Sequence, residues 1–272
     1  MASADTPLRL ENVTVRFGPV TALNRVSLSL ERGETAVLLG AAGSGKTVFL
    51  KTALALIQPD EGDVYLFGQA TRRLKESALY DLRSRLGILF QEGGLFDSMT
   101  IEENVAYPLL NQKSLRCPPA EVQARVKEAL EFVELGHTLA KIPSELSGGM
   151  RRRVGIARAV VTRPELLLYD SPTAGLDPIT ATTIMTLIVK ERDTRGTTTA
   201  MATHRYQDGH LLANYRYNAS TGRLEAAPGG GDDLRTRFIV LGEGRIVFEG
   251  SQDELEASTD PYVSKFAKRL TE

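Results

Sequence analysis

Eight consecutive residues, at positions 40 to 47, have the types and the spacing that hold phosphate groups. They read Gly40-Ala41-Ala42-Gly43-Ser44-Gly45-Lys46-Thr47 and match the pattern G-x-x-x-x-G-K-[ST]. The glycines let successive backbone N–H groups turn toward one anion, and a following helix adds the positive end of its dipole. Lys46 can reach the β- and γ-phosphates of a nucleoside triphosphate, and the Thr47 hydroxyl can bind Mg²⁺. These residues predict a site for a nucleoside triphosphate with Mg²⁺.

The elements on both sides of this loop fit that chemistry. An apolar run at positions 35–39 leads into the loop and predicts a buried strand, and residues 48–54 predict the start of a helix. The alternative is a glycine-rich turn that binds nothing. A strand before the loop and a helix after it favour the phosphate site.

Four further polar residues stand at the ends of predicted strands or at a turn. Gln91, Asp170 and His204 each end or follow an apolar strand, and Asp177 lies in the turn before a helix. Taken singly, such residues are ordinary surface or core side chains. A carboxylate that a buried strand delivers beside a phosphate loop can hold Mg²⁺ through water. We therefore expect these side chains to surround the nucleotide.

The remaining patterns predict the other elements. Residues 8–17 and 26–31 alternate apolar and polar side chains, which indicates half-buried antiparallel strands. Residues 98–163 are mostly helical in pattern, with a capped helix start at Thr100. Three arginines, Arg151–Arg153, are typical of a solvated helix face.

An apolar stretch at residues 93–110 carries more apolar surface than a solvated loop needs. The residues concerned are Leu95, Phe96, Met99, Ile101, Tyr107 and Leu109. We expect this stretch to face a partner protein at the membrane.

Composition bounds the class of protein. The chain has 272 residues, 42% hydrophobic and 25% charged, which allows one large α/β domain or a domain with a subdomain. The net charge of −1 gives no basic field, so we expect no nucleic-acid partner. Cys117 is the single cysteine, which excludes an internal disulfide. The first residues lack the pattern of a signal peptide, and no apolar run approaches the roughly 20 residues of a membrane span.

The segment Leu146-Ser147-Gly148-Gly149-Met150 is similar to the signature L-S-G-G-Q of ABC transporter ATPases. With the other motifs in the same order, the chain resembles the ATPase subunit of ABC transporters over almost its full length. The resemblance implies an α/β P-loop NTPase fold with a RecA-like core, an antiparallel β-subdomain at its start and an inserted helical subdomain. The implied bounds are 7–250 for the ATPase domain, 7–98 and 156–250 for its core, 99–155 for the helical subdomain and 251–272 for a C-terminal tail.

Within that family the chain looks most like the ATPases of Mla/Mce-type phospholipid transporters. The residues behind this likeness are 89–97, 103–109, Met150, 177–180 and 260–266. The resemblance implies a cytoplasmic protein, peripheral on the inner face of the bacterial cell membrane. It implies a second ATPase subunit in a homodimer, a polytopic permease of the MlaE type and an Mce-domain lipid-binding protein as partners.

The resemblance also implies roles for single residues around ATP and Mg²⁺, in a head-to-tail dimer that holds two ATP molecules. Phe17 would stack on adenine, and Asp177 would couple the two sites. Ser147, Gly148 and Gly149 would grip the γ-phosphate of the other subunit's ATP. The implied catalytic residues are Gln91, Asp170, Ser171 and His204, the phosphate-binding residues are Gly40, Ala41, Ala42, Gly43, Ser44, Gly45, Lys46 and Thr47, and the Mg²⁺ ligands are Thr47, Gln91 and Asp170.

The chain departs from the family pattern at position 171. The family usually has a glutamate after the strand aspartate, where it polarises the attacking water, and this chain has Ser171. A serine hydroxyl is a poor base at neutral pH, and general-base assistance is worth about 10²–10⁴ in rate. Three interpretations compete: a native slow site, a site rescued by another group, and an engineered trap. We favour a native sequence that hydrolyses ATP slowly.

A second departure is extra chain at about residues 210–236. Alternation around Thr221-Gly222 predicts a hairpin, and residues 228–233 predict a flexible linker. We expect a solvated surface excursion.

The leading function is a transport ATPase that drives a lipid permease. The alternatives are the ATPase of another ABC importer or exporter, and a nucleotide-gated binding module with little turnover.

Overall fold

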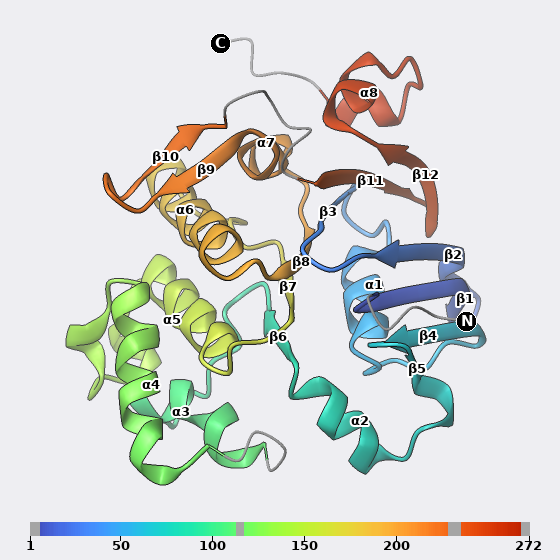
Figure 1. Ribbon diagram of the computed structural model, residues 1–272. Coiled ribbons are helices and arrows are strands. Elements are labelled where there is room, and N and C mark those ends of the chain that lie inside the picture. The colour runs from blue at the N-terminus through green and yellow to red at the C-terminus, as the bar shows by residue number, and fades with distance from the viewer. Residues whose placement is uncertain (1–5, 113–116, 228–234, 268–272) are drawn as a thin grey trace.

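The main sheet contains the strands that the apolar runs predict (Figure 1). The computed structural model describes residues 6–112, 117–227 and 235–267. Within these residues, strands pair in the order β12-β11-β3-β8-β7-β6, parallel throughout except between β11 and β12. Residues of β3, β7 and β8 are buried at every position, which is typical of parallel strands covered on both faces. The strands are β3 (Thr35–Leu39), β6 (Leu86–Leu89), β7 (Leu166–Asp170), β8 (Thr198–Ala202), β11 (Thr236–Gly242) and β12 (Arg245–Gly250).

A second sheet is antiparallel and comes from the start of the chain, as the alternation predicts. Its strands pair in the order β2-β1-β4-β5. Apolar side chains from this sheet, from helix α1 and from the main sheet form one buried cluster that includes Leu10, Phe49 and Leu38. Because α1 is packed between the two sheets, the loop before it has a fixed position. The elements are β1 (Leu8–Phe17), β2 (Val20–Leu30), β4 (Glu61–Leu66), β5 (Gln69–Ala70) and α1 (Lys46–Ala53).

The predicted helical region contains three helices that pack on one another, at the lower left of Figure 1. The capped start at Thr100 is confirmed: the Glu103 N–H donates to Thr100 Oγ1 at 3.2 Å, and the Thr100 N–H donates to the Glu103 carboxylate at 2.7 Å. Among the described residues, no helix is both long enough and apolar enough to cross a membrane. The helices are α3 (Ile101–Asn111), α4 (Pro119–Phe132) and α5 (Gly148–Val160), and α2 (Glu76–Arg83) precedes them.

Two expectations for this region are wrong for particular residues. Ile101 and Leu109 do not face a partner, because the helical period turns them into the core, where they are 0% and 4% exposed. Phe96 and Tyr107 stay exposed, with their ring centroids 4.7 Å apart. Arg152 does not lie on a solvated face either. Its side chain is buried, because this face of α5 packs on the chain that follows β7.

The extra chain near residue 220 forms the predicted hairpin. Strands β9 (Tyr215–Asn218) and β10 (Arg223–Ala226) pair antiparallel after helix α7 (Tyr206–Asn214), beside α6 (Pro178–Arg195). The hairpin lies at the surface, with β10 mostly exposed, as expected for a solvated excursion. It is also tied to α6, because buried Arg192 donates to the Tyr215 carbonyl at 2.7 Å and Asp193 accepts from the Tyr217 N–H at 2.7 Å. The predicted linker at 228–233 lies outside the described residues. Helix α8 (Gln252–Ala257) follows β12.

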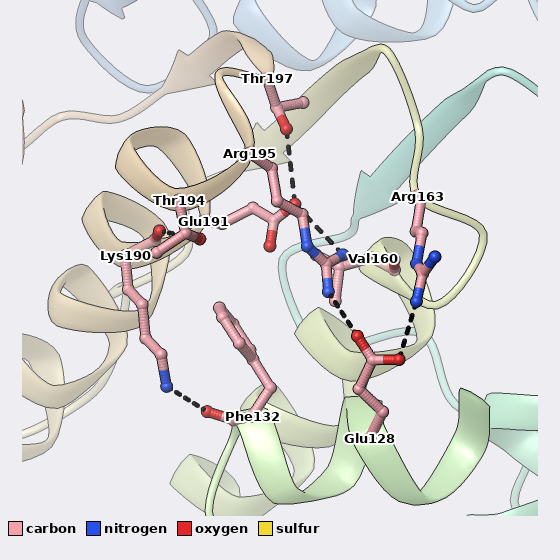
Figure 2. A network of polar contacts seen from close by, with 9 residues as sticks. All are labelled: Glu128, Phe132, Val160, Arg163, Lys190, Glu191, Thr194, Arg195 and Thr197. Carbon is pink, nitrogen blue, oxygen red and sulfur yellow. Dashed lines mark hydrogen bonds and ion pairs between the residues drawn. The ribbon is translucent and has the colours of Figure 1, made fainter. Parts of the chain in front are cut away.

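A network of charged side chains joins α4 to the end of α6 (Figure 2). Glu128 of α4 accepts from Arg163 at 2.9 Å and from Arg195 at 3.4 Å. Arg195 also donates to the Val160 carbonyl at 3.1 Å and lies 3.5 Å from the buried carboxylate of Glu191. We call Glu128, Arg163, Glu191 and Arg195 the α4–α6 network. It ties the helical region to the main sheet's covering helix through paired charges.

Candidate functional site

The phosphate loop connects β3 to α1, and its close approach to neighbouring strands requires glycine. Gly45 caps α1 with φ +105, a conformation that side chains other than glycine rarely adopt. A Cβ at Gly45 would lie 2.5 Å from the carbonyl oxygen of Ala22, and one at Gly40 would lie 2.6 Å from that of Leu241. The loop therefore lies tightly under β2 and β11. Its N–H groups at the start of α1 form an anion site.

Lys46 points its ammonium group back over this loop. Its Nζ donates to the carbonyl oxygens of Gly40 at 2.7 Å and Ala41 at 2.8 Å, and to Ser44 Oγ at 3.4 Å. Burial lowers the pKa of Lys46 from its ordinary value, and the negative charge of Asp170 opposes the change. The result is a cation held at the mouth of the loop, where phosphate oxygens would meet it.

An open cleft of about 660 Å³ brings several predicted residues together. Its lining includes the loop residues Ala42, Gly43, Gly45, Lys46 and Thr47, and also Gln91, Ser171 and His204. These side chains come from four separate segments of the sequence, and the parallel order of β3, β8, β7 and β6 brings the segments to one edge. The volume is within the range of small-molecule sites.

The predicted Mg²⁺ ligands fit that ion chemically. Thr47 offers a hydroxyl, Gln91 an amide oxygen and Asp170 a carboxylate at the end of β7, and Mg²⁺ prefers such hard oxygen donors. Within the described ranges, no group of three His, Cys, Asp or Glu side chains gathers to hold a metal. Mg²⁺ sites of this kind take one or two protein ligands and complete their shell with phosphate oxygens and water. Bound there, the ion would neutralise phosphate charge.

Ser171 follows Asp170 in an unusual backbone conformation. Its φ is +50, in the left-handed region, and its N–H donates to the Ala202 carbonyl at 2.8 Å. Its hydroxyl donates to Asp170 Oδ1 at 3.2 Å. Ser171 lines the cleft, but its hydroxyl proton is already donated to the Asp170 carboxylate. The hydroxyl is therefore not set up to accept a proton from water.

The signature residues form a second surface, outside the lining of that cleft. Ser147 caps α5 by accepting from the Met150 N–H at 3.3 Å, which leaves Gly148 and Gly149 at the helix start. Asp177 caps the neighbouring helix α6, and the hydrogen bonds it accepts, with Thr180 first, lower its pKa. Ile179, beside this cap, is 81% exposed. Two helix N-termini and an exposed apolar residue make a surface suited to an anion and a protein partner.

Phe17 lies at the end of β1, half exposed, opposite Val20. Val20 lines the cleft, whereas Phe17 itself is not among the lining residues. Sequence reasoning missed Glu243 and Gly244, which also line the cleft. The Gly244 N–H donates to the Ser44 carbonyl at 3.3 Å. The local signal is a short Glu-Gly turn, which lies between β11 and β12, and such a turn does not reveal a partner 200 positions away.

Comparison with known proteins identifies the class. The ABC transporter family model matches residues 23–174. The chain therefore belongs to the ABC transporter family. It is an ATP-binding subunit with the P-loop ATPase fold of that family, as the sequence resemblance implied.

Curated relatives are ATP-binding proteins of transport systems. The chain is 32% identical over 257 residues to the intermembrane phospholipid transport system ATP-binding protein MlaF of Escherichia coli (strain K12), covering 94% of this chain and 87% of that protein. MlaF of Haemophilus influenzae is 30% identical, with 96% and 90% covered. The probable ribonucleotide transport ATP-binding protein mkl of Mycobacterium leprae is 36% identical over 72% of this chain. The chain spans 56% of that mkl protein's length.

Solved structures agree with this fold. A bacterial ABC transporter cassette solved as a dimer is 31% identical, with a TM-score of 0.74 over 90% of this chain and 98% of the other. A dimeric ATP-binding cassette in a post-hydrolysis state, bound to ADP and Pi, has a TM-score of 0.73 at 31% identity over the same shares of the two chains.

Proposed function

We propose that this chain binds and hydrolyses ATP to drive a phospholipid permease of the MlaE type. The observation that carries the proposal is the cleft, where the phosphate loop, Gln91, Ser171 and His204 line one space. The lipid class rests on the likeness to the MlaF proteins, which extends over nearly the whole chain. The protein would act as a peripheral subunit on the cytoplasmic face of the bacterial cell membrane.

In this proposal each segment of the cleft has one task. The loop N–H groups and Lys46 hold the β- and γ-phosphates, and the ring of Phe17 covers the adenine. Thr47, Gln91 and Asp170 hold Mg²⁺ directly or through water. His204 donates to the γ-phosphate as negative charge develops on it, which is the usual way such donors lower the barrier.

The second surface, at the starts of α5 and α6, would complete the site of another copy. Ser147 and Gly149 would grip the γ-phosphate bound to that copy's loop, in a head-to-tail homodimer. The dimeric cassettes of similar fold support this arrangement. Because ATP would contact both copies, it would hold the dimer together, and hydrolysis would release it.

Hydrolysis in isolation would be slow, because Ser171 replaces the carboxylate that usually accepts a proton from water. Positioning by Lys46, His204 and the signature residues remains, so some catalysis remains too. The alternatives are an ATPase of another ABC importer or exporter, to which the mkl likeness gives support, and a nucleotide-gated module with little turnover.

The permease would dock beside α3. A groove of about 560 Å³ lies between α3 and α4 and is lined by Met99, Tyr107, Leu110 and Val122. The ring of Phe96 packs at a tilt against that of Tyr107 next to the groove, and Leu110 is 64% exposed. Such apolar exposure around a groove is typical of a surface that binds an apolar helix of a partner. An Mce-domain lipid-binding protein would join through that permease.

The test is purification of the full chain from detergent-extracted membranes of its own cells. We expect a polytopic permease and bound phospholipid to accompany the wild-type chain, and ATP to be hydrolysed faster in the complex than by the chain alone. Phe96→Asp is expected to lose the permease and the stimulation while it still binds ATP, because the charge would enter an apolar contact.

The matched control is Val247→Asp, a charge placed at an exposed apolar residue of β12, away from the groove. It is expected to keep the permease. A permease that carries a water-soluble substrate and no lipid would favour another importer or exporter, and a Phe96→Asp complex that assembles normally would place the docking surface elsewhere.

A further inference from the structure

Arg152 is a buried cation in the helix that begins with the signature. It lies one turn into α5 and is only 7% exposed. Its Nη1 donates to the carbonyl oxygens of Ser171 at 2.9 Å and Pro172 at 2.7 Å, and its Nη2 donates to Ala174 at 3.3 Å. A charged group is buried in a protein only where such contacts replace its hydration. One guanidinium thus holds three carbonyls of the chain that follows the Mg²⁺-site strand β7.

The segment that Arg152 holds has to be held from outside. Ser171 has the left-handed φ of +50, which side chains other than glycine rarely adopt, and it lies next to Asp170 in the cleft. Strained backbone of this kind persists only where the surrounding structure fixes it. The carbonyl of Ser171 itself is one of the three that Arg152 binds.

A second buried side chain, Asp208, fixes the same segment. Asp208 of α7 is 2% exposed and accepts from the Thr173 hydroxyl at 2.6 Å and from the Thr203 hydroxyl at 2.7 Å. Thr203 directly precedes His204. The segment 171–174 is therefore bound both to the signature helix, by Arg152, and, through Asp208, to the strand end that carries His204.

The signature also lies against the start of α6, which follows this segment in the chain. A Cβ on Gly149 would lie 2.5 Å from Cγ2 of Thr180, in the first turn of α6. The starts of α5 and α6 are thus pressed together in one chain. Displacement of the signature would be transmitted to residues 171–180 by contact at Gly149 and by hydrogen bonds at Arg152.

We propose that Arg152 is a positioning residue that couples the signature surface of a chain to the Ser171 segment of the same chain's own cleft. Nucleotide engaged by Ser147 and Gly149 then sets the geometry of hydrolysis at the cleft of that chain. This rests on the proposed ATP-dependent dimer, in which the two surfaces of one chain belong to different ATP sites. Arg152 would act through the backbone and would not touch the nucleotide.

The experiment compares Arg152→Gln, Arg152→Lys and the control Arg153→Gln in the purified full chain. Arg153 is next in α5, but its guanidinium donates to the Val133 carbonyl at 3.2 Å and lies 3.8 Å from Glu134, away from the cleft. For each protein, kcat, KM and the Hill coefficient for Mg-ATP hydrolysis are measured, with the affinity for a fluorescent ATP analogue.

Arg152→Gln is expected to lower kcat about tenfold, because a small displacement of a catalytic segment is enough for such a loss. Its affinity for the analogue should stay within about twofold, and its Hill coefficient should fall from above 1 to about 1, since coupling between sites is lost. Arg152→Lys keeps the charge but cannot bind three carbonyls as the planar guanidinium does, so its kcat should lie between those of the wild type and Arg152→Gln. Arg153→Gln should match the wild type.

A Hill coefficient of 1 in the wild type, or Arg152→Gln kinetics within twofold of wild type, would overturn the inference. Loss of kcat, affinity and thermal stability together would show a merely structural arginine. If Arg152→Gln does not fold, the test uses Arg152→Lys instead: a lowered kcat with unchanged affinity for the analogue supports the inference, and unchanged kcat overturns it. The measurement needs only the purified chain, so the absence of a lipid permease leaves it standing, whereas a wild type that binds no ATP would defeat the proposed function instead.

Discussion

Lys46 in the phosphate loop and Arg195 in the α4–α6 network are both shielded cations, but their charges are satisfied in opposite ways. Lys46 donates to the carbonyl oxygens of Gly40 and Ala41 in its own loop. Arg195 lies between the carboxylates of Glu128 and Glu191 and also binds the Val160 carbonyl. Carbonyl dipoles orient a cation without neutralising it, whereas two carboxylates cancel its charge. The loop therefore keeps its attraction for an anion, and the network does not.

The contrast separates charges that recognise a ligand from charges that build the fold. The two regions meet at strand β7, which ends in Asp170 beside the cleft. Tyr169, the residue before Asp170, faces the network instead: its pKa is raised by burial and by the charge of Glu191. Neighbouring strand residues point to opposite faces. A change on one face should affect binding, and a change on the other should affect stability.

The largest expected effect is from Lys46→Ala. The variant loses the cation proposed to meet the β- and γ-phosphates, so affinity for a fluorescent ATP analogue should fall at least about 100-fold, as for lost charge-assisted hydrogen bonds. Lys190→Ala removes a lysine beside the network, whose Nζ donates to the Phe132 carbonyl at 3.4 Å, and should change the affinity less than about twofold. Undiminished affinity of Lys46→Ala would show that the phosphates bind elsewhere.

A smaller effect is expected from Ser171→Glu. The new carboxylate would stand in the cleft beside Asp170 and accept a proton from the attacking water, so kcat should rise at least about tenfold with KM nearly constant. Ser171→Ala is the control and should leave kcat close to the wild-type value, because the hydroxyl serves as a donor to Asp170. If Ser171→Glu adds nothing to a wild type that already turns over rapidly, another group is the base.

The smallest effect, on the network side, is expected from Glu191→Gln. Glu191 is buried, and its Oε2 finds no hydrogen-bond partner within the described residues. Burial raises the pKa of Glu191, an effect that Arg195 opposes. The folded chain then binds the proton more tightly than the unfolded chain, so Glu191 costs stability as pH rises from its ordinary pKa of 4.5 through the raised value.

Removal of that titrating group should change the pH dependence in one direction. The Tm of Glu191→Gln, relative to wild type, should increase from pH 4.5 to pH 8 by a few degrees, since one pKa unit corresponds to about 1.4 kcal/mol. Thermal melts at several pH values measure it, and ATP affinity should not change. A relative Tm that is flat or falls with pH would contradict the buried charge.

The sequence predicts the parts of this molecule that depend on local pattern. The strand before Gly40, the capped helix at Thr100 and the hairpin at Thr221 follow from periodicity and turn chemistry, which act over a few residues. Arg152 and Glu191 are different. An arginine between two arginines, and a glutamate four residues from Arg195, both have the pattern of surface charges.

Tertiary contacts decide their burial. Arg152 is buried because the chain 19 residues later folds over it, and no local pattern records that approach. Departures from a motif are visible in sequence, as at Ser171, but what the departure touches is not. The hydrogen bond from Ser171 to Asp170 and the three carbonyls held by Arg152 required the folded chain.

The β9–β10 hairpin also offers a convenient position for attaching a label. Its turn, residues 219–222, is exposed, and its strands are tied to α6 by Arg192 and Asp193. In Figure 1 it lies across the molecule from α1 and the phosphate loop. Exposed turns tolerate inserted residues well. A dye or a short affinity peptide placed there would keep a fixed position relative to α6. The distance between two such labels would then test whether the proposed dimer forms when ATP binds.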